Sequence, residues 1–206
     1  MSFITKEKSV ALYAALVSFG TYVFIFGFRK SFTVCTFEGM TFGPIAFKTA
    51  MVISQMLGYL MAKFYGIKFI SGLEKKNRYK IIFLLTGIAW AAWLLFAIVP
   101  APYSILFLFI NGFPLGMLWG VVFSYVEGRR STDFIGAALA VSFIFSAGWV
   151  KSVGAWLMLN FHITETWVPF CTGLVFALPL VLCVLGLEKV PPPSIEDEAW
   201  RAQRIQ

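Results

Sequence analysis

Charge is scarce in this sequence, and acidic charge is the scarcest. Charged residues make up 13% of the 206 residues, and ten Asp and Glu stand against seventeen Lys and Arg. A water-facing surface cannot be assembled from so few charges, whereas a surface that faces lipid needs none. With 59% hydrophobic residues and 23 phenylalanines, the composition excludes a soluble globular protein and predicts an all-α integral membrane protein.

Residues that carry enzyme or metal chemistry are also nearly absent. His162 is the one histidine, and the three cysteines form no CxxC motif and lie within or beside apolar runs. An intramembrane protease would need a GxSxG serine, paired aspartates or an HExxH motif, and the sequence contains none of them. We therefore expect no enzyme activity, no metal site and no cofactor.

Six long apolar segments dominate the chain. Each is at least about 20 residues long, which is enough to cross a hydrocarbon core of about 30 Å. The sequence thus predicts a six-helix transmembrane domain over residues 9–187. It lies between a cytoplasmic N-terminus (1–8) and a cytoplasmic, proline-rich tail (188–206) that we interpret as a truncated linker. The six segments are 9–36, 42–70, 79–99, 103–126, 132–159 and 167–187.

The basic residues orient these segments. Thirteen of the seventeen Lys and Arg residues fall at alternate connections. By the positive-inside rule, both termini are expected in the cytoplasm and the chain in the cell (inner) membrane. Because the clusters are short and lie between apolar runs, they indicate membrane topology and not nucleic-acid binding. The thirteen are Lys6, Lys8, Lys63, Lys68, Lys75, Lys76, Arg78, Lys80, Arg129, Arg130, Lys189, Arg201 and Arg204.

Four further bases, Arg29, Lys30, Lys48 and Lys151, lie within the apolar segments or on the opposite side. A charge near the bilayer centre costs about 2.5–3.5 kcal/mol on insertion scales, so each is a candidate binding residue. The alternative is that these side chains extend to the headgroups at the nearer membrane surface. Lys63 is open to the same two interpretations, as a cavity residue or an interfacial one.

Helical spacing supports an inward-facing set. Tyr22 and Arg29 lie seven residues apart on one polar face of the first segment. Gln55 shares a face with Lys48 in the second segment by the same spacing. Because no Asp or Glu lies well inside any segment, these cations need water or a bound anion. We therefore hypothesise a cavity for a small anionic solute. Its candidate binding residues are Arg29, Lys30, Tyr22, Lys63, Lys151, Gln55 and Lys48.

A row of glycines in the fourth segment has a structural interpretation. Gly112, Gly116 and Gly120 form a GxxxGxxxG row, which lets a neighbouring helix approach closely. Asn111 and Pro114 in the same segment are expected to loosen the helix locally.

Two resemblances extend this interpretation. Residues 22–32 read YVFIFGFRKSF and resemble the first helix of the organophosphate:phosphate antiporters of the major facilitator superfamily, as Lys63-Phe64 resembles their second. The six-helix plan is similar to the N-terminal half of that superfamily. A closer likeness is to a bacterial membrane family of unknown function, through the stretches FRKSFTVCTFEG, ISQMLGYLMAKFYGIKFIS, NGFPLGMLWGVVFSYVEGRRS and WVKSVG.

The resemblance implies secondary transport of a small anion by alternating access. Arg29 would be the principal contact, with Lys63, Lys30, Lys151 and Tyr22 assisting, and a second six-helix half would complete the cavity in a longer chain or a dimer. The chain departs from the superfamily at Ala62, which stands where its motif has an aspartate. The alternative is a non-transporting membrane module: a sensor, an assembly factor or a lipid-binding scaffold.

Overall fold

The computed structural model is an all-α bundle, 79% helical. It describes residues 2–72, 77–194, 196–197 and 199–200. Within that part of the chain a short 3₁₀ helix, η1 (Ser31–Val34), and a two-stranded antiparallel hairpin, β1 (Thr41–Phe42) and β2 (Ile45–Ala46), accompany the long helices. The long helices are α1 (Ser2–Lys30), α2 (Phe47–Ser71), α3 (Arg78–Ile98), α4 (Ile105–Phe123), α5 (Thr132–Phe161) and α6 (Val168–Glu188).

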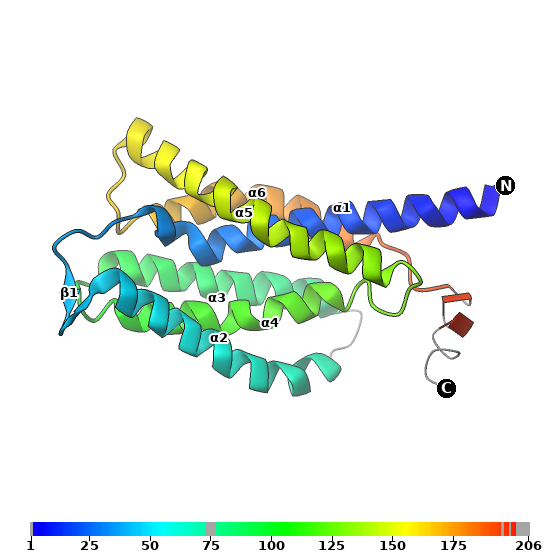
Figure 1. Cartoon of the computed structure of the whole chain (residues 1–206), viewed down its shortest axis with the longest axis horizontal. Helices are drawn as coiled ribbons and strands as arrows, with labels where there is room; N and C mark the ends of the chain where they lie inside the picture. The colour runs from blue at the N-terminus through cyan, green and yellow to red at the C-terminus, as the bar shows by residue number, and fades with distance from the viewer. Residues whose placement is uncertain (1, 73–76, 195, 198, 201–206) are drawn as a thin grey trace.

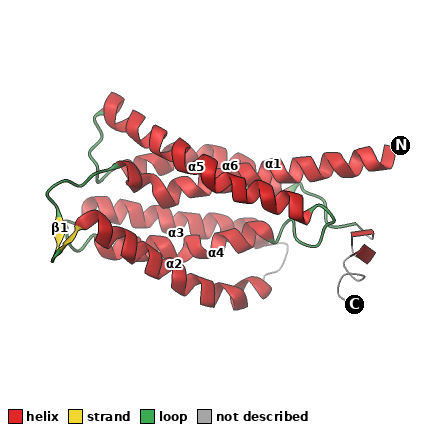
Figure 2. Cartoon of the chain, viewed as in Figure 1, coloured by secondary structure: helices red, strands yellow, loops and turns green. Residues whose placement is uncertain are grey.

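The long helices run side by side along the length of the bundle (Figure 1). α2 packs mainly on α4, which also contacts α3, while α5 and α6 both pack on α1. The hairpin lies at one end of the bundle and the start of α1 at the other. Helix accounts for almost all of the bundle, and strand is confined to that one tip (Figure 2).

Five of these helices are apolar enough to cross a membrane, which supports a multi-pass membrane protein. The spans are residues 7–34, 78–98, 105–123, 132–161 and 168–188. The sequence predicts six spans, and α2 is the predicted segment outside these five: its 25 residues are long enough but include Lys48, Gln55, Lys63 and Lys68. Each polar side chain lowers the mean hydropathy of the helix, although α2 still runs alongside α4.

The connection between α1 and α2 also differs from the prediction. The apolar runs at 9–36 and 42–70 suggested helix, yet α1 ends at Lys30 and α2 begins at Phe47. Gly39 and Gly43 adopt positive φ values of 75° and 57°, and Pro44 follows directly. Positive φ and proline are both incompatible with a continuing helix, so a hairpin forms from residues whose apolar character alone suggested helix.

Glu165, in the loop before α6, forms hydrogen bonds with the loop that follows η1. Its carboxylate accepts hydrogen bonds from the backbone N–H of Thr36 (2.6 Å), the Thr36 hydroxyl (2.9 Å) and the N–H of Phe37 (2.7 Å). Partial burial raises the pKa of Glu165, but these bonds and the nearby Lys48 outweigh it and hold its pKa below the ordinary value.

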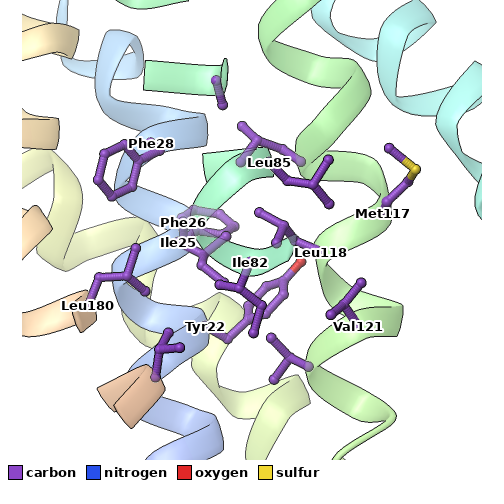
Figure 3. Close-up of a cluster of buried hydrophobic side chains, with 14 of the residues drawn as sticks. Tyr22, Ile25, Phe26, Phe28, Ile82, Leu85, Met117, Leu118, Val121 and Leu180 are labelled. Carbon is purple, nitrogen blue, oxygen red and sulfur yellow. The ribbon is translucent and has the colours of Figure 1, made fainter. Parts of the chain in front are cut away.

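The interior is filled by one large apolar cluster. It joins Tyr22, Ile25 and Phe28 of α1 to residues of α3, α4 and α6, as Figure 3 shows. Phe28 is 1% exposed and Leu118 of α4 is 0% exposed. This packing holds α1 at the centre of the bundle, so the neighbouring helices determine where its polar side chains point.

Our first prediction concerns whether α2 crosses the membrane. In a chain whose native cysteines are replaced, we expect Glu38→Cys to react with a membrane-impermeant maleimide in intact cells. Ser71→Cys and Ser131→Cys should react only after lysis. All three positions lie outside the helix centres, so labelling reports the side of the membrane. Labelling of Glu38→Cys and Ser71→Cys from the same side would contradict a crossing by α2.

A second prediction follows from the Glu165 carboxylate. Glu165→Gln should lower the free energy of unfolding by about 1 kcal/mol at neutral pH, because charge-assisted hydrogen bonds are replaced by weaker ones. Since the folded-state pKa is lowered, the stabilisation is complete above about pH 5 and is lost as the pH falls through that lowered value. Thermal unfolding in detergent from pH 7 to pH 3 measures the difference. A difference that grew towards low pH would contradict the assignment.

Candidate functional site

The site depends on three buried side chains that hold the end of α1. Where α1 tightens into η1, its last carbonyls lose α-helical partners. The Gln55 side-chain amide donates to the Arg29 carbonyl (2.8 Å), and the Asn111 amide donates to the Phe28 carbonyl (3.1 Å). The Trp93 indole donates to the same Phe28 carbonyl (2.5 Å). One residue from each of α2, α4 and α3 therefore fixes the backbone that carries Arg29.

Gln55 and Asn111 also bond to each other. The Gln55 amide donates to the Asn111 side-chain oxygen (2.8 Å), and the Asn111 amide reaches the Ala89 carbonyl as well (2.9 Å). The two side chains are 2% and 0% exposed. A polar group in a membrane interior is stable only when its hydrogen bonds are made, so the pair forms one satisfied unit.

The glycine row allows α2 and α4 to approach closely enough for this contact. A Cβ atom at Gly112 would collide with the Gln55 carbonyl, and one at Gly116 would collide with the Ala62 side chain. Gly58 faces the α4 backbone in the same way. The row thus lies against α2, in the position expected for a small-residue packing face.

Arg29 points into the bundle and not towards the nearer membrane surface. Its guanidinium lies over the Tyr59 ring, 4.2 Å from the centroid, although its backbone lies at the level of Gln55. Four residues of α2 separate those levels, a descent of about 6 Å. Tyr59 is at the midpoint of α2, so the Arg29 charge is displaced towards the middle of the bundle. The Arg29 Nε atom is buried and has no hydrogen-bond partner among the described residues.

Lys63 reaches the same ring from the other direction. Its Nζ lies 4.7 Å from the Tyr59 centroid and 5.9 Å from the Trp119 ring of α4. Because Cβ atoms tilt towards the start of a helix and α1 and α2 are antiparallel, Arg29 and Lys63 both incline towards the middle of the bundle. The structure thus brings two of the predicted cations to one tyrosine.

Beside this pair lies an open cleft of about 320 Å³. It separates α2 and α4 from α5, and its wall is part aromatic, part small and part cationic. Phe143 forms the α5 side and packs edge-on against the Tyr22 ring at 4.8 Å. Tyr22 is 2% exposed. The cleft is lined by Tyr59, Lys63, Trp119, Gly136, Ala140 and Phe143.

The other predicted site residues lie elsewhere. Lys48 donates to the Thr33 (3.0 Å) and Cys35 (2.5 Å) carbonyls, so it caps the end of η1. Lys30 lies over Phe32, 5.8 Å from its centroid. Lys151 is exposed on α5. It follows Ala140 by eleven residues, about three helical turns, so it lies on the same face of α5 as the cleft but further along the helix.

No acidic residue balances these cations. Within the described ranges, no carboxylate pairs with Arg29, Lys63, Lys30 or Lys151. Cation–π contacts of about 0.5–2 kcal/mol are smaller than the cost of holding charge away from water. The geometry therefore provides a basic, aromatic-walled cleft that can attract an anion.

Gln55, Asn111 and Trp93, which hold the end of α1, form a polar hub. The hub and the basic cleft belong to a multi-pass α-helical membrane protein. The chain belongs to the DUF5690 family, a family of unknown function, whose profile matches residues 31–206. No curated protein and no solved structure matches the chain. The relation to the major facilitator superfamily consequently stays a prediction.

Sequence reasoning placed Gln55 among the binding residues, whereas the structure gives it a backbone-holding role. It overlooked the partnership of Asn111 with Gln55, and it missed Trp119 and Phe143 as cleft residues. A lone amide in the most apolar stretch of α4 was the available signal for Asn111, since such a group needs a buried partner. Nothing in the local sequence distinguishes Trp119 from the other tryptophans.

A third prediction tests the hub. Asn111→Leu should lower the free energy of unfolding by about 3 kcal/mol, because the Gln55 amide and two carbonyls each lose a partner in a buried setting. Asn160→Leu is the matched control, since Asn160 is exposed and its amide donates to the Trp156 carbonyl within its own helix. Denaturation in mixed micelles compares the two. Equal losses in both variants would contradict the hub.

Proposed function

We propose that this chain binds a small anionic solute in the cleft between α2, α4 and α5 and forms one wall of a secondary transporter. The observation that carries the proposal is the convergence of Arg29 and Lys63 on Tyr59 at mid-bundle. Two cations at one ring in a membrane-spanning bundle are stable when an anion or water offsets them. Arg29 would supply a planar donor set for phosphate or carboxylate oxygens.

The hydroxyl groups and rings of the wall would complete the site. Tyr59 orients both cations, and Trp119 covers one side of the Lys63 ammonium. Tyr22 lies behind Phe143, where rotation of that ring would give its hydroxyl access to the cleft. Lys151 and Lys30 would extend the positive potential towards the outer end, where an entering anion is first attracted.

The proposal includes a second wall. The cleft is lined by Lys63 and flanked by the exposed apolar faces of α2 and α5. Without a second wall, the Lys63 ammonium would be exposed to lipid. A second six-helix half, in a longer chain or in a dimer, would enclose it and allow alternating access at the interface. In this scheme both termini are cytoplasmic and the six-helix unit alone does not transport.

The fourth prediction is anion-dependent stability of the purified protein in detergent. Phosphate, phosphorylated sugars and carboxylates are screened, and one class should raise the melting temperature. A ligand at a hundred times its Kd adds about 2.7 kcal/mol to the apparent stability. Arg29→Ala and Lys63→Ala should each weaken that anion at least about tenfold, the effect of losing one charge-assisted contact.

Lys68→Ala is the matched control, because Lys68 is an exposed cation in the last turn of α2. It should leave the anion response unchanged. An equal weakening in all three variants would indicate general charge attraction and contradict a site in the cleft. An absence of any response in the wild type, with a second half present, would favour the non-transporting module.

A further inference from the structure

A second cavity lies at the opposite end of the bundle from the hairpin. It has a volume of about 240 Å³ and is lined by the start of α1, the loop between α4 and α5, and the segment after α6. Its wall is mostly apolar, through Val10, Ala11, Pro191 and Pro192, with a few polar groups. This composition is typical of a small-molecule site and does not resemble the basic cleft.

The segment after α6 closes this cavity by folding back onto the α4–α5 loop. The Arg129 side chain donates to the Pro191 carbonyl, and the Arg130 N–H donates to the Asp197 carboxylate (2.9 Å). Asp197 also accepts from the Ser194 N–H and hydroxyl, both at 2.9 Å. In the segment that the sequence predicts to be a linker, hydrogen bonds therefore hold Pro191, Ser194 and Asp197 in place.

Arg129 is the cation of the cavity, and its hydrogen bonds are incomplete. The residue is 5% exposed, and its Nε is buried without a partner. Nη2 donates to the Pro191 carbonyl, so Nε is the buried guanidinium atom left without a partner among the described residues. Burial lowers the pKa of Arg129, and the Asp197 charge offsets this only in part. A buried guanidinium in this state favours an added acceptor.

Glu7 supplies the opposite charge. It lines the same cavity, yet its carboxylate forms neither an ion pair nor a hydrogen bond within the described residues. The other acid, Asp197, is already satisfied by the N–H and hydroxyl donors. The Arg129 guanidinium, with its buried Nε unpaired, and the Glu7 carboxylate therefore face one cavity without pairing with each other. This arrangement suits a ligand that carries both signs of charge.

The position of the cavity along the helices limits the class of ligand that it can bind. α1, α5 and α6 are each apolar enough to cross a membrane. At this end of the bundle α5 begins at Thr132 and α6 ends at Glu188, while Glu7 lies near the start of α1. Ser131 and Pro191 therefore lie just beyond the ends of two helices that can span a membrane, and the layer of phospholipid headgroups begins where such spans end.

We propose that this cavity binds a small zwitterion in which a phosphate ester and a primary ammonium are joined by a short link, as in a phosphoethanolamine group. The phosphate oxygens accept from Arg129, and the ammonium donates to Glu7. Val10, Pro191 and Pro192 contact the carbon atoms of the link. The group is carried either by a membrane lipid or by a free phosphoethanolamine molecule, since the two present the same chemistry.

The test measures binding by native mass spectrometry of the detergent-purified chain. Its probes are short-chain phosphatidylethanolamine, phosphatidylcholine and phosphatidylglycerol with matched acyl chains. We expect phosphatidylethanolamine to bind at least about tenfold more tightly than the other two, since only it offers both the phosphate and N–H donors. Soluble phosphoethanolamine in competition separates the sources: displacement shows that the group alone suffices, and no displacement assigns the site to the lipid.

Two variants make the test specific. Glu7→Gln should remove the preference of about tenfold for phosphatidylethanolamine over anionic phosphatidylglycerol, because the ammonium loses its partner. Arg129→Gln should weaken all three lipids. Arg130→Gln is the control, as its side chain is 50% exposed and lies 4.0 Å from Glu196, outside the cavity lining. Equal binding of the three lipids, or an unchanged preference in Glu7→Gln, would overturn the proposal. Glu7 is exposed, so its variant tests the site even where Arg129→Gln fails to fold.

Discussion

The end of α1 is the constraint on which this structure depends. In a membrane interior no water satisfies a helix end, so every carbonyl released there must find a partner within the protein. Gln55, Asn111 and Trp93 provide that partner from three different helices. The contact requires α2 and α4 to approach at their glycines, and it sets the direction of Arg29. Packing, hydrogen bonding and the position of the charge are therefore consequences of a single backbone requirement.

The bundle has two charged sites, one at its middle and one at the start of α1, and they differ in the signs of the charges that they contain. At mid-bundle, Arg29 and Lys63 share a tyrosine and form no ion pair within the described residues, and Lys63 makes the cleft positive. At the α1 start, Arg129 lines a cavity together with Glu7 and Asp197, so that site carries charges of both signs. The anion proposed for the first site and the zwitterion proposed for the second are inferred from these local charges and not from the net charge of the chain.

Lys48 shows why a basic residue in an apolar run is an ambiguous signal. Periodicity placed it with Gln55 on one face, but its ammonium is used by the carbonyls of Thr33 and Cys35. Arg29 carries the same formal charge and is displaced towards the bundle centre. The difference depends on which carbonyl ends lie within reach. Contacts between residues more than a dozen positions apart determine this, and no local pattern records it.

Composition and apolar segment lengths by themselves determined that the chain is a helical membrane protein, because lipid tolerates neither abundant charge nor unpaired backbone. The glycine spacing likewise determined a close helix contact. Only the tertiary structure decided that Gln55 and Asn111 hold a helix end, that Tyr59 collects two cations, and that the segment after α6 closes a cavity with Glu7. Each of these depends on side chains brought together from distant helices. Sequence spacing specifies the face of a helix and leaves open what that face will meet.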